Sequence, residues 1–508
     1  MGFGENVAKV QRGTIDRISE LPEFILHTIL SMLDTEEAGR ASVLSKRWYD
    51  AWSSIPVLNF HYFQKYRYGL YDYNDDANDR LVGFIDKTME RYFRQKYRIT
   101  KMCLTLPKVD EKLKPLVDKW IMIAVQNQIQ KFEIQLLGGR YGLPEILFSA
   151  KSLKYLKCSN VELPYYATMD LVSLEYLTLL TNTLDEGMLQ EIISFSPLVE
   201  LYIAYDKGFK TISLPWMKKV NGGVESHGNG TMQSNLQEYP LQKFVYIGLD
   251  EKSPWPWNLN VAALKNLRNL EFECAPITDD IVSELSYGLV VLESLKISAC
   301  SKLECINISS NSLKQLEITD NSELKKATID APKLLEFYCI CEVGTSLSLI
   351  RALDHCNARF LLLYPDSVTN VWPVALKKFL VETNFFKSLE IEFTSPLEMV
   401  VEEDQLRNAG TGLPYKLREL KLFGTSILTP TKSSLVAFLN GLFWCCHPDV
   451  LSMTTDLQDA AAKLILSILK EKTECWKDPL KSIEVESIEY PRLLSHSSEL
   501  EIRLRLSW

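Results

Sequence analysis

The sequence predicts an α/β fold in which a short helical unit precedes a long, curved array of repeats. Residues 14–60 carry apolar residues at helical spacing, whereas from about residue 97 the pattern L-x-x-L-x-L returns repeatedly after 21 to 25 residues. Repeats of about 20–29 residues with this pattern are typical of leucine-rich repeats, in which each coil buries its apolar edge against the next. We therefore expect residues 97–508 to form a leucine-rich-repeat solenoid.

The N-terminal unit is expected to contain three short helices. Leu21-Pro22 precedes an apolar face formed by Ile25 and Ile29, and proline in a first turn has no hydrogen bond to lose. Asp34 is suited to cap the second helix, because its carboxylate can accept a bond from a free backbone N–H. The third apolar-faced segment carries Ala41, Val43, Leu44, Trp48 and Trp52.

The repeats are of two lengths, and the length predicts what each coil contains. The longer ones leave room for a helix on the return path, which we expect at 184–197, 278–289 and 346–356. Between 292 and 340 the apolar anchors recur every 10 or 11 residues, too few for a helix beside a strand. These coils should carry strands on both edges. Anchors of the repeats are Leu153, Leu174, Leu198, Leu267, Leu292, Leu313, Leu334 and Leu417.

Four further segments complete the predicted organisation. Residues 1–13 form a polar tail, and 61–96 connect the helical unit to the repeats and include one amphipathic helix. Residues 219–238 are poor in apolar side chains and rich in Gly, Asn and Ser, which favours a flexible excursion. Beyond about 390 we expect further strands, with helices at 433–444 and 457–471.

Composition narrows the class of protein. The net charge of −9 gives no global electrostatic reason to bind nucleic acid or an anionic membrane. The 11 cysteines are odd in number and scattered, which favours a reducing compartment over a disulfide framework. The first 13 residues lack the apolar stretch of a signal peptide and no apolar run reaches membrane length, so we expect neither a secretory signal nor a membrane span. The expected location is the cytoplasm, the nucleus or both.

Residues that could carry chemistry are few. Cys445-Cys446-His447 could suggest a metal, but adjacent cysteines rarely ligate one tetrahedral ion. Cys356 beside His355 is the nearest approach to a nucleophile and base, and Cys339 fills a leucine position of a repeat. No glycine-rich phosphate loop occurs. We therefore expect a protein without catalytic activity, cofactor or metal.

Residues 16–60 closely resemble the F-box of plant F-box/leucine-rich-repeat proteins. The segments 147–164, 193–203 and 327–339 resemble the repeats of that family, and 444–453 resembles a C-terminal segment of some members. The positions that carry the F-box resemblance are Leu21, Pro22, Ile29, Leu30, Leu33, Ala38, the run Ser42-Val43-Leu44-Ser45-Lys46-Arg47-Trp48, and Trp52.

The resemblance implies a substrate-recognition subunit of a Skp–cullin–F-box ubiquitin ligase, with the F-box on a Skp-type adaptor and the repeats on a protein target. The alternative is a repeat scaffold that engages the adaptor without driving ubiquitination. Some apolar residues of so short a unit must form its core, and the surplus is better explained by a partner. The expected adaptor-binding residues are Leu21, Pro22, Ile25, Ile29, Leu30, Val43, Leu44 and Trp48.

The target is expected on the concave sheet, where residues flanking the middle leucine of each repeat point outward. Tyrosines gather toward the F-box end of this row, and acids outnumber bases further along, which favours a target of some basic character. A solvated face with incidental tyrosines is the alternative. The candidate target-binding residues are Tyr155, Tyr176, Tyr202, Glu271, Glu317 and Tyr338.

Overall fold

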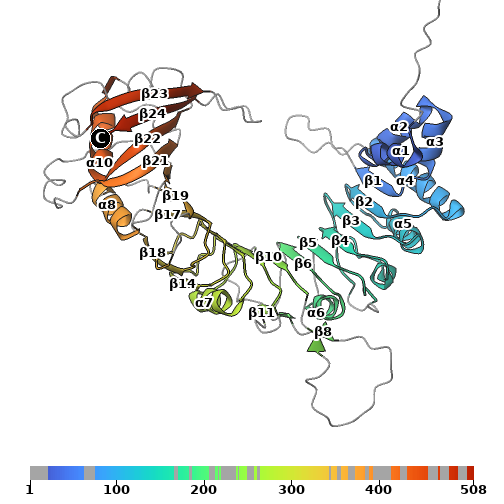
Figure 1. Ribbon diagram of the computed structural model, residues 1–508. Helices are drawn as coiled ribbons and strands as arrows, with labels where there is room; N and C mark the ends of the chain where they lie inside the picture. The colour runs from blue at the N-terminus through green and yellow to red at the C-terminus, as the bar shows by residue number, and fades with distance from the viewer. Residues whose placement is uncertain are drawn as a thin grey trace, which may run out of the picture. The chain divides into compact units, whose positions relative to one another are not determined.

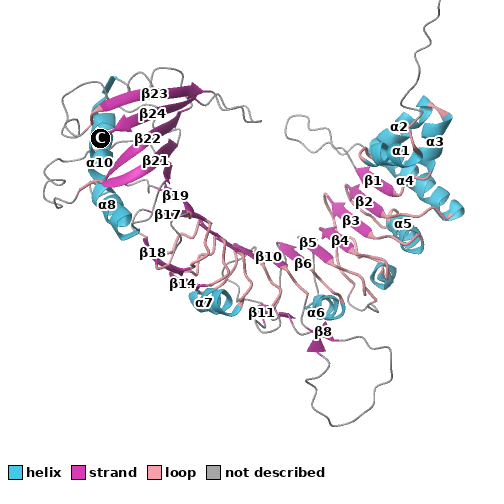
Figure 2. Ribbon diagram, in the orientation of Figure 1, coloured by secondary structure: helices cyan, strands magenta, loops and turns pink. Residues whose placement is uncertain are grey.

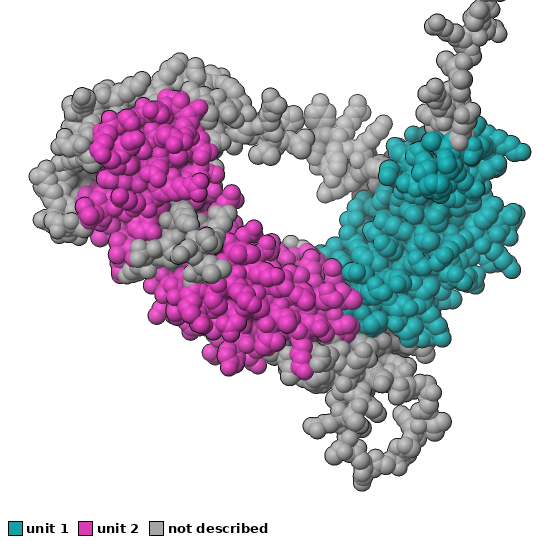
Figure 3. Space-filling view, in the orientation of Figure 1, with its two compact units in different colours: residues 1–198, 206–209, 220–226 teal, residues 199–205, 210–219, 227–508 magenta. Residues whose placement is uncertain are grey.

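The computed structural model contains two compact units, which we describe one at a time (Figures 1 and 3). The first holds the described residues up to Leu198 and the second those from Val199 onward. The described residues are 21–61, 75–164, 170–181, 186–204, 212–214, 217–218, 236–237, 240–248, 257–259, 264–342, 345–351, 356–363, 372–383, 388–392, 413–423, 432–455, 467–468, 480–489 and 500–508.

The first unit begins with short helices that pack around Leu26, Leu30 and Trp48. The Asp34 carboxylate accepts a hydrogen bond from the Glu37 amide at 2.6 Å, so it caps the second helix as the sequence predicts. The helices are α1 (Glu23–Ser31), α2 (Thr35–Ala41) and α3 (Lys46–Ser53), with a 3₁₀ turn over Ser42–Leu44 between the last two.

A parallel sheet follows directly. Strand β1 (Val57–His61) comes immediately after the helices and pairs with β2, with Val57 opposite Lys101. Helices α4 and α5 both lie on one side of this sheet (Figure 2). Its further elements are α4 (Asp75–Gln95), β2 (Lys101–Leu106), α5 (Lys114–Gln126), β3 (Lys131–Leu136), a 3₁₀ turn (Glu145–Ser149), β4 (Tyr155–Ser159), β5 (Tyr176–Leu180) and α6 (Glu186–Phe195).

The second unit extends the same motif over a longer main sheet. Its parallel strands are β6 (Glu200–Ala204), β10 (Lys243–Ile247), β12 (Asn269–Glu273), β13 (Ser294–Ser298), β15 (Gln315–Thr319), β17 (Glu336–Glu342), β19 (Asn357–Leu363), β20 (Ser388–Glu392), β21 (Tyr415–Phe423) and β22 (Cys446–Thr455). Two antiparallel strands follow β22, first β24 (Leu500–Ser507) and then β23 (Ser482–Glu489). Its helices are α7 (Asp279–Gly288), α8 (Trp372–Thr383) and α10 (Lys432–Cys445), and short strand pairs are β7 (Ile212–Leu214) with β11 (Trp257–Leu259) and β8 (Met217–Lys218) with β9 (Leu236–Gln237).

A second, three-stranded parallel sheet accompanies β13, β15 and β17. Its strands are β14 (Cys305–Ser309), β16 (Lys326–Asp330) and β18 (Ser346–Leu349), and it lies beside α7 (Figure 1). The prediction that the coils between 292 and 340 carry strands on both edges and no helix is therefore confirmed.

The predicted helices have mixed outcomes. Helices α6, α7 and α10 confirm those expected at 184–197, 278–289 and 433–444. The helix expected at 346–356 is wrong: Ser346–Leu349 forms β18, because Leu347 continues the buried row of Ile306 on β14 and Ala327 on β16. Residues 1–13, nearly all of the excursion at 219–238 and most of 457–471 lie outside the described residues. The boundaries at 14–60, 61–96 and 97–508 stay predictions.

Five strands of the main pattern are each followed by a left-handed residue. Asn160 and Thr181 follow β4 and β5 in the first unit, while Cys274, Ala299 and Asp320 follow β12, β13 and β15 in the second. The amides of Asn160, Cys274 and Ala299 extend the ladder by one bond; for example, the Ala299 amide donates to the Thr319 carbonyl oxygen at 2.9 Å. The turn geometry is thus repeated even where alanine must adopt it.

Candidate functional sites

The F-box-like helices expose large apolar side chains. Val43 and Leu44, in the 3₁₀ turn between α2 and α3, are 84% and 64% exposed, and Phe24, Met32 and Tyr49 are also exposed. Each exposed apolar side chain forgoes the stabilisation of about 1.5–3 kcal/mol that full burial would give. Such a set on one small unit indicates a surface that a partner covers.

The structure divides the predicted adaptor-binding residues into two groups. Pro22, Val43 and Leu44 are exposed and Leu21, Ile25 and Ile29 are half-buried, so all six have side-chain surface to offer. Leu30 and Trp48 have none to spare, because their side chains are 0% and 5% exposed in the core between α1 and α3. These two support the unit from within, which corrects their placement in a binding surface.

Sequence reasoning missed Phe24, Met32 and Tyr49. Each is large and apolar, yet each lies off the apolar stripe on which the helical pattern was counted. Their position off the stripe is the sequence signal that could have identified them, since an apolar residue outside the stripe of a surface helix is not needed for the core.

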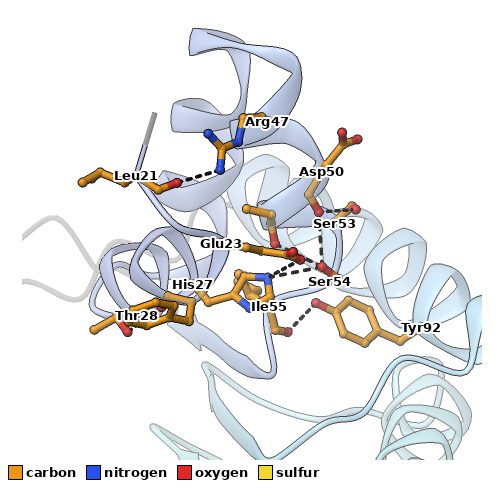
Figure 4. Close-up of polar contacts among 12 residues, drawn as sticks. Leu21, Glu23, His27, Thr28, Arg47, Asp50, Ser53, Ser54, Ile55 and Tyr92 are labelled. Carbon is orange, nitrogen blue, oxygen red and sulfur yellow. Dashed lines mark hydrogen bonds and ion pairs between the residues drawn. The ribbon is translucent and has the colours of Figure 1, made fainter. Parts of the chain in front are cut away.

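Polar contacts fix the helices to one another and to α4 (Figure 4). The Arg47 guanidinium donates to the Leu21 carbonyl oxygen at 2.8 Å, which ties α3 to the start of α1. The Tyr92 hydroxyl of α4 donates to the Ile55 carbonyl oxygen at 2.6 Å, and burial raises the pKa of this hydroxyl well above its ordinary value. The guanidinium carbon of Arg91 also lies 4.0 Å from the centroid of the Trp52 ring. These contacts therefore fix the positions of the helices that carry the exposed apolar side chains.

The first unit brings two predicted target-binding residues together. The Tyr155 and Tyr176 rings, on β4 and β5, have centroids 6.3 Å apart. Burial is the main cause that raises the pKa of the Tyr155 hydroxyl, with the Glu133 carboxylate adding to it. Tyr202 is on β6 of the second unit. The structure therefore shows Tyr155 and Tyr176 as a pair within the first unit, and the predicted cluster that also includes Tyr202 stays a prediction.

The second unit has a hollow of about 570 Å³ on the face of its main sheet, the β13–β20 hollow. Glu317 and Tyr338, two predicted target-binding residues, are directly opposite each other on β15 and β17 and both line it. Glu271 on β12 lies opposite Lys296, one strand beyond. The residues lining the hollow are Ser294, Leu295, Lys296, Gln315, Leu316, Glu317, Glu336, Phe337, Tyr338, Arg359 and Glu390.

The hollow is polar and internally bonded. The Lys296 ammonium nitrogen lies 3.1 Å from a Glu317 carboxylate oxygen, and this contact is the main cause that raises the pKa of Lys296. The Gln315 side-chain amide donates to the Glu336 carboxylate at 3.0 Å. Together these bonds orient two carboxylates across neighbouring strands. Such a surface can bind a polar or charged group but holds no nucleophile and base in bonding contact.

The cysteine and histidine candidates are accounted for by packing. The thiols of Cys445 and Cys446 are buried and donate to backbone carbonyl oxygens, as the Cys445 thiol does to Pro373 at 2.9 Å. The His447 ring stacks on the Trp508 ring, with centroids 3.8 Å apart. Within the described part of the chain, no three His, Cys, Asp or Glu side chains gather as a metal would require. His355 lies outside that part.

Comparison with known proteins adds independent evidence. The F-box domain model matches residues 18–60, and the model described as At1g61320/AtMIF1, LRR domain, matches residues 253–439. The two matches fall on the α1–α3 helices with β1 and on the middle of the second unit. None of the described helices is both long and apolar enough to cross a lipid bilayer.

Three similar proteins from Arabidopsis thaliana illustrate the relationship. The F-box/LRR-repeat protein At3g03360 is 29% identical over 374 residues, which cover 71% of this chain and 72% of that protein. The putative F-box protein At1g49610 is 31% identical over 188 residues, and the putative F-box/FBD/LRR-repeat protein At5g22670 is 32% identical over 189 residues. These two matches cover 37% and 36% of this chain and only 43% and 40% of the relatives.

The chain therefore combines an F-box domain with a leucine-rich-repeat domain. This is the combination found in plant F-box/leucine-rich-repeat proteins, and the resemblance stated for residues 16–60 and for the repeats is confirmed.

Proposed function

We propose that this protein is the substrate-recognition subunit of a Skp–cullin–F-box ubiquitin ligase. The observation that carries the proposal is the exposed apolar surface of the F-box, above all Val43 and Leu44. An adaptor that covers these side chains would remove them from water. This burial would stabilise the complex by about 25 cal/mol per Å² of apolar surface. We further infer that helices α1–α3 are the complete F-box and that the parallel strands of each unit are coils of a leucine-rich-repeat solenoid.

The proposed role is one of proximity rather than chemistry. A receptor that holds a target beside a ubiquitin-conjugating enzyme raises the effective concentration of the acceptor lysine. The repeats supply the surface for that target, either at the Tyr155–Tyr176 pair or at the β13–β20 hollow. The proposed location is the cytoplasm or nucleus, and the proposal includes no nucleic acid or membrane partner.

The adaptor interface can be tested with a double variant, Val43→Ala with Leu44→Ala. Because both side chains are exposed, their loss should change the free energy of unfolding by less than about 0.5 kcal/mol per site. Removing two side chains that the adaptor would bury should nevertheless weaken binding to a Skp-type adaptor at least about tenfold. The measurement is the dissociation constant of the complex between the purified full chain and the adaptor.

The matched control is Tyr287→Ala with Val290→Ala, two apolar residues of the second unit that are 80% and 69% exposed. This control should bind the adaptor as the unaltered chain does. Full adaptor binding by Val43→Ala with Leu44→Ala would overturn the proposed interface. The scaffold alternative is separated by target lifetime: a receptor shortens it and depends on Val43 and Leu44, whereas a scaffold leaves it unchanged.

A further inference from the structure

The face of the main sheet in the second unit has a pronounced excess of negative charge. Between β12 and β20 its described, outward-facing side chains include five carboxylates against two cations, Lys296 and Arg359. The whole chain is far more balanced, with 65 acidic and 56 basic residues. The carboxylates are Glu271, Glu273, Glu317, Glu336 and Glu390.

The arrangement of these charges is fixed by the register of the strands. Glu271, Lys296, Glu317, Tyr338 and Arg359 stand opposite one another on five successive strands. The row thus places a half-buried aromatic ring between a carboxylate and an exposed guanidinium. The hydrogen-bonded pairing of each strand with the next therefore fixes the order of these five side chains across the sheet.

The β13–β20 hollow lies along this row and gives it depth. The outward-facing side chains around it are the half-buried Tyr338 ring and the Glu317, Glu336 and Glu390 carboxylates, while Leu295, Leu316 and Phe337 alternate with them and are buried on the other face of the sheet. A hollow of about 570 Å³ can accept one or two extended side chains. An aromatic ring beside acidic side chains suits the long aliphatic stem and cationic head of arginine or lysine.

We propose that the β13–β20 hollow binds a basic segment of the target protein, with an arginine or lysine of that segment seated against Tyr338. This inference rests on the proposed function, because it names the class of target that the receptor takes. The ring of Tyr338 offers a cation–π contact. Of the three carboxylates nearby, Glu317 and Glu390 also contact Lys296 and Lys421, at 3.1 and 3.6 Å. Glu336 accepts from the neutral Gln315 amide, so Glu336 contributes most to neutralising the bound charge. An acidic segment would meet like charge over most of the face.

The test is selection of binders from a random twelve-residue peptide library by the full chain. Peptides enriched in arginine or lysine are expected, and their binding should weaken as salt rises because exposed charges are screened. The triple variant Glu317→Gln, Glu336→Gln, Glu390→Gln should lower the affinity of the selected peptides at least about tenfold. Tyr338→Ala should lower it by about two- to fivefold, and Tyr338→Phe by less.

A matched control removes the same number of charges elsewhere in the second unit. Glu304→Gln, Glu323→Gln, Asp330→Asn alters three acids outside the hollow lining and should leave peptide affinity unchanged. Arg359→Glu should strengthen binding of the basic peptides.

Three results would overturn the proposal: selection of acidic or uncharged peptides, no enrichment at all, or equal losses in the two triple variants. None of these bears on the adaptor, so the dissociation constant of the adaptor complex, measured on the same proteins, tests the receptor proposal separately.

Discussion

Two kinds of coil can be compared in this protein, one backed by a helix and one backed by a strand. In the first unit, Lys101 pairs with Lys131, 30 residues later, and the return path includes the 13-residue helix α5. In the second unit, Ser294 pairs with Gln315, only 21 residues later, and the return path is strand β14. The pairing of the main sheet is parallel and in register in both. The length of the return path therefore decides its secondary structure, while the sheet pattern stays the same.

The junction between the two kinds of coil shows how the second sheet begins. Strand β14 has α7 beside it in place of a preceding strand, and α7 supplies side-chain acceptors for its backbone. The Asp279 carboxylate accepts from the Glu304 and Cys305 amides at 3.1 and 3.0 Å, and the Ser286 hydroxyl accepts from the Ser309 amide at 3.2 Å. An exposed strand edge invites pairing with other chains, so these bonds close an edge that would otherwise be open.

The helix-backed coil should be broken most severely by Trp120→Ala. Trp120 is fully buried on α5, and its indole nitrogen donates to the Asp86 carboxylate of α4 at 3.0 Å. Loss of this side chain should cost about 3–5 kcal/mol. Native-state hydrogen exchange should show the loss in β2 and β3. Trp120→Phe, which keeps most of the volume, should cost less, and unchanged protection in Trp120→Ala would contradict the packing role.

The strand-backed coil should depend instead on a buried amide, that of Asn321. Its side-chain oxygen accepts from the Cys300 amide at 2.8 Å, and its nitrogen donates to the Ile297 carbonyl oxygen at 3.2 Å. Asn321→Ala leaves both backbone groups without these partners and should cost about 2–3 kcal/mol in urea unfolding. Asn307→Ala, an exposed asparagine of β14, is the control and should be nearly neutral.

The junction is tested by Asp279→Ala, for which we expect a loss of about 1 kcal/mol. The amides of Glu304 and Cys305 are near solvent, so water replaces part of the lost bonding. Asp280→Ala serves as the control, because Asp280 shares the first turn of α7 and thus the effect of the helix dipole. Equal losses in the two variants, with no rise in self-association for Asp279→Ala, would argue against an edge-closing role.

The smallest expected effect is a gain. Ala299 has φ of 51°, a left-handed conformation that glycine adopts at lower cost. Ala299→Gly should therefore stabilise the strand-backed region by about 0.5–1 kcal/mol in thermal unfolding. Ala327→Gly, made at a buried position inside β16, should do the opposite. A loss of stability in Ala299→Gly would show that the turn does not store this strain.

Much of this comparison could be predicted from the sequence. Strand positions such as Leu295 and Leu316 follow from alternation alone, and the 10- and 11-residue spacing revealed β14 and β16. The sequence wrongly indicates a helix at 346–356, because Leu349, Ile350 and Leu353 recur at helical spacing. Leu347 and Leu349 alternate as in a strand, and only the neighbouring strand decides between the two periods. The sequence could not show that β18 would pair with β16 and add a third strand to this sheet.

The candidate sites were predicted unevenly for a similar reason. Glu317 and Tyr338 were found because outward positions follow from strand alternation, but a hollow requires the relative depth of side chains on several strands. In the F-box, pattern alone cannot tell which apolar residues pack inside. Leu30 and Val43 look equally apolar in sequence, yet one is buried and the other is 84% exposed.

Strand β1 limits how this F-box can be handled as a separate piece. The strand lies within the matched segment 18–60, but it belongs to the sheet through β2 and to the helices through the Asn59 amide, which donates to the Thr35 hydroxyl at 2.8 Å. A fragment that starts after residue 60 would leave the edge of β2 bare and prone to aggregate. A fragment that ends there would lose both β2 and the Tyr92 bond. The F-box of this protein is therefore a poor cassette for exchange between relatives, and proteolysis should release it only together with the first repeats.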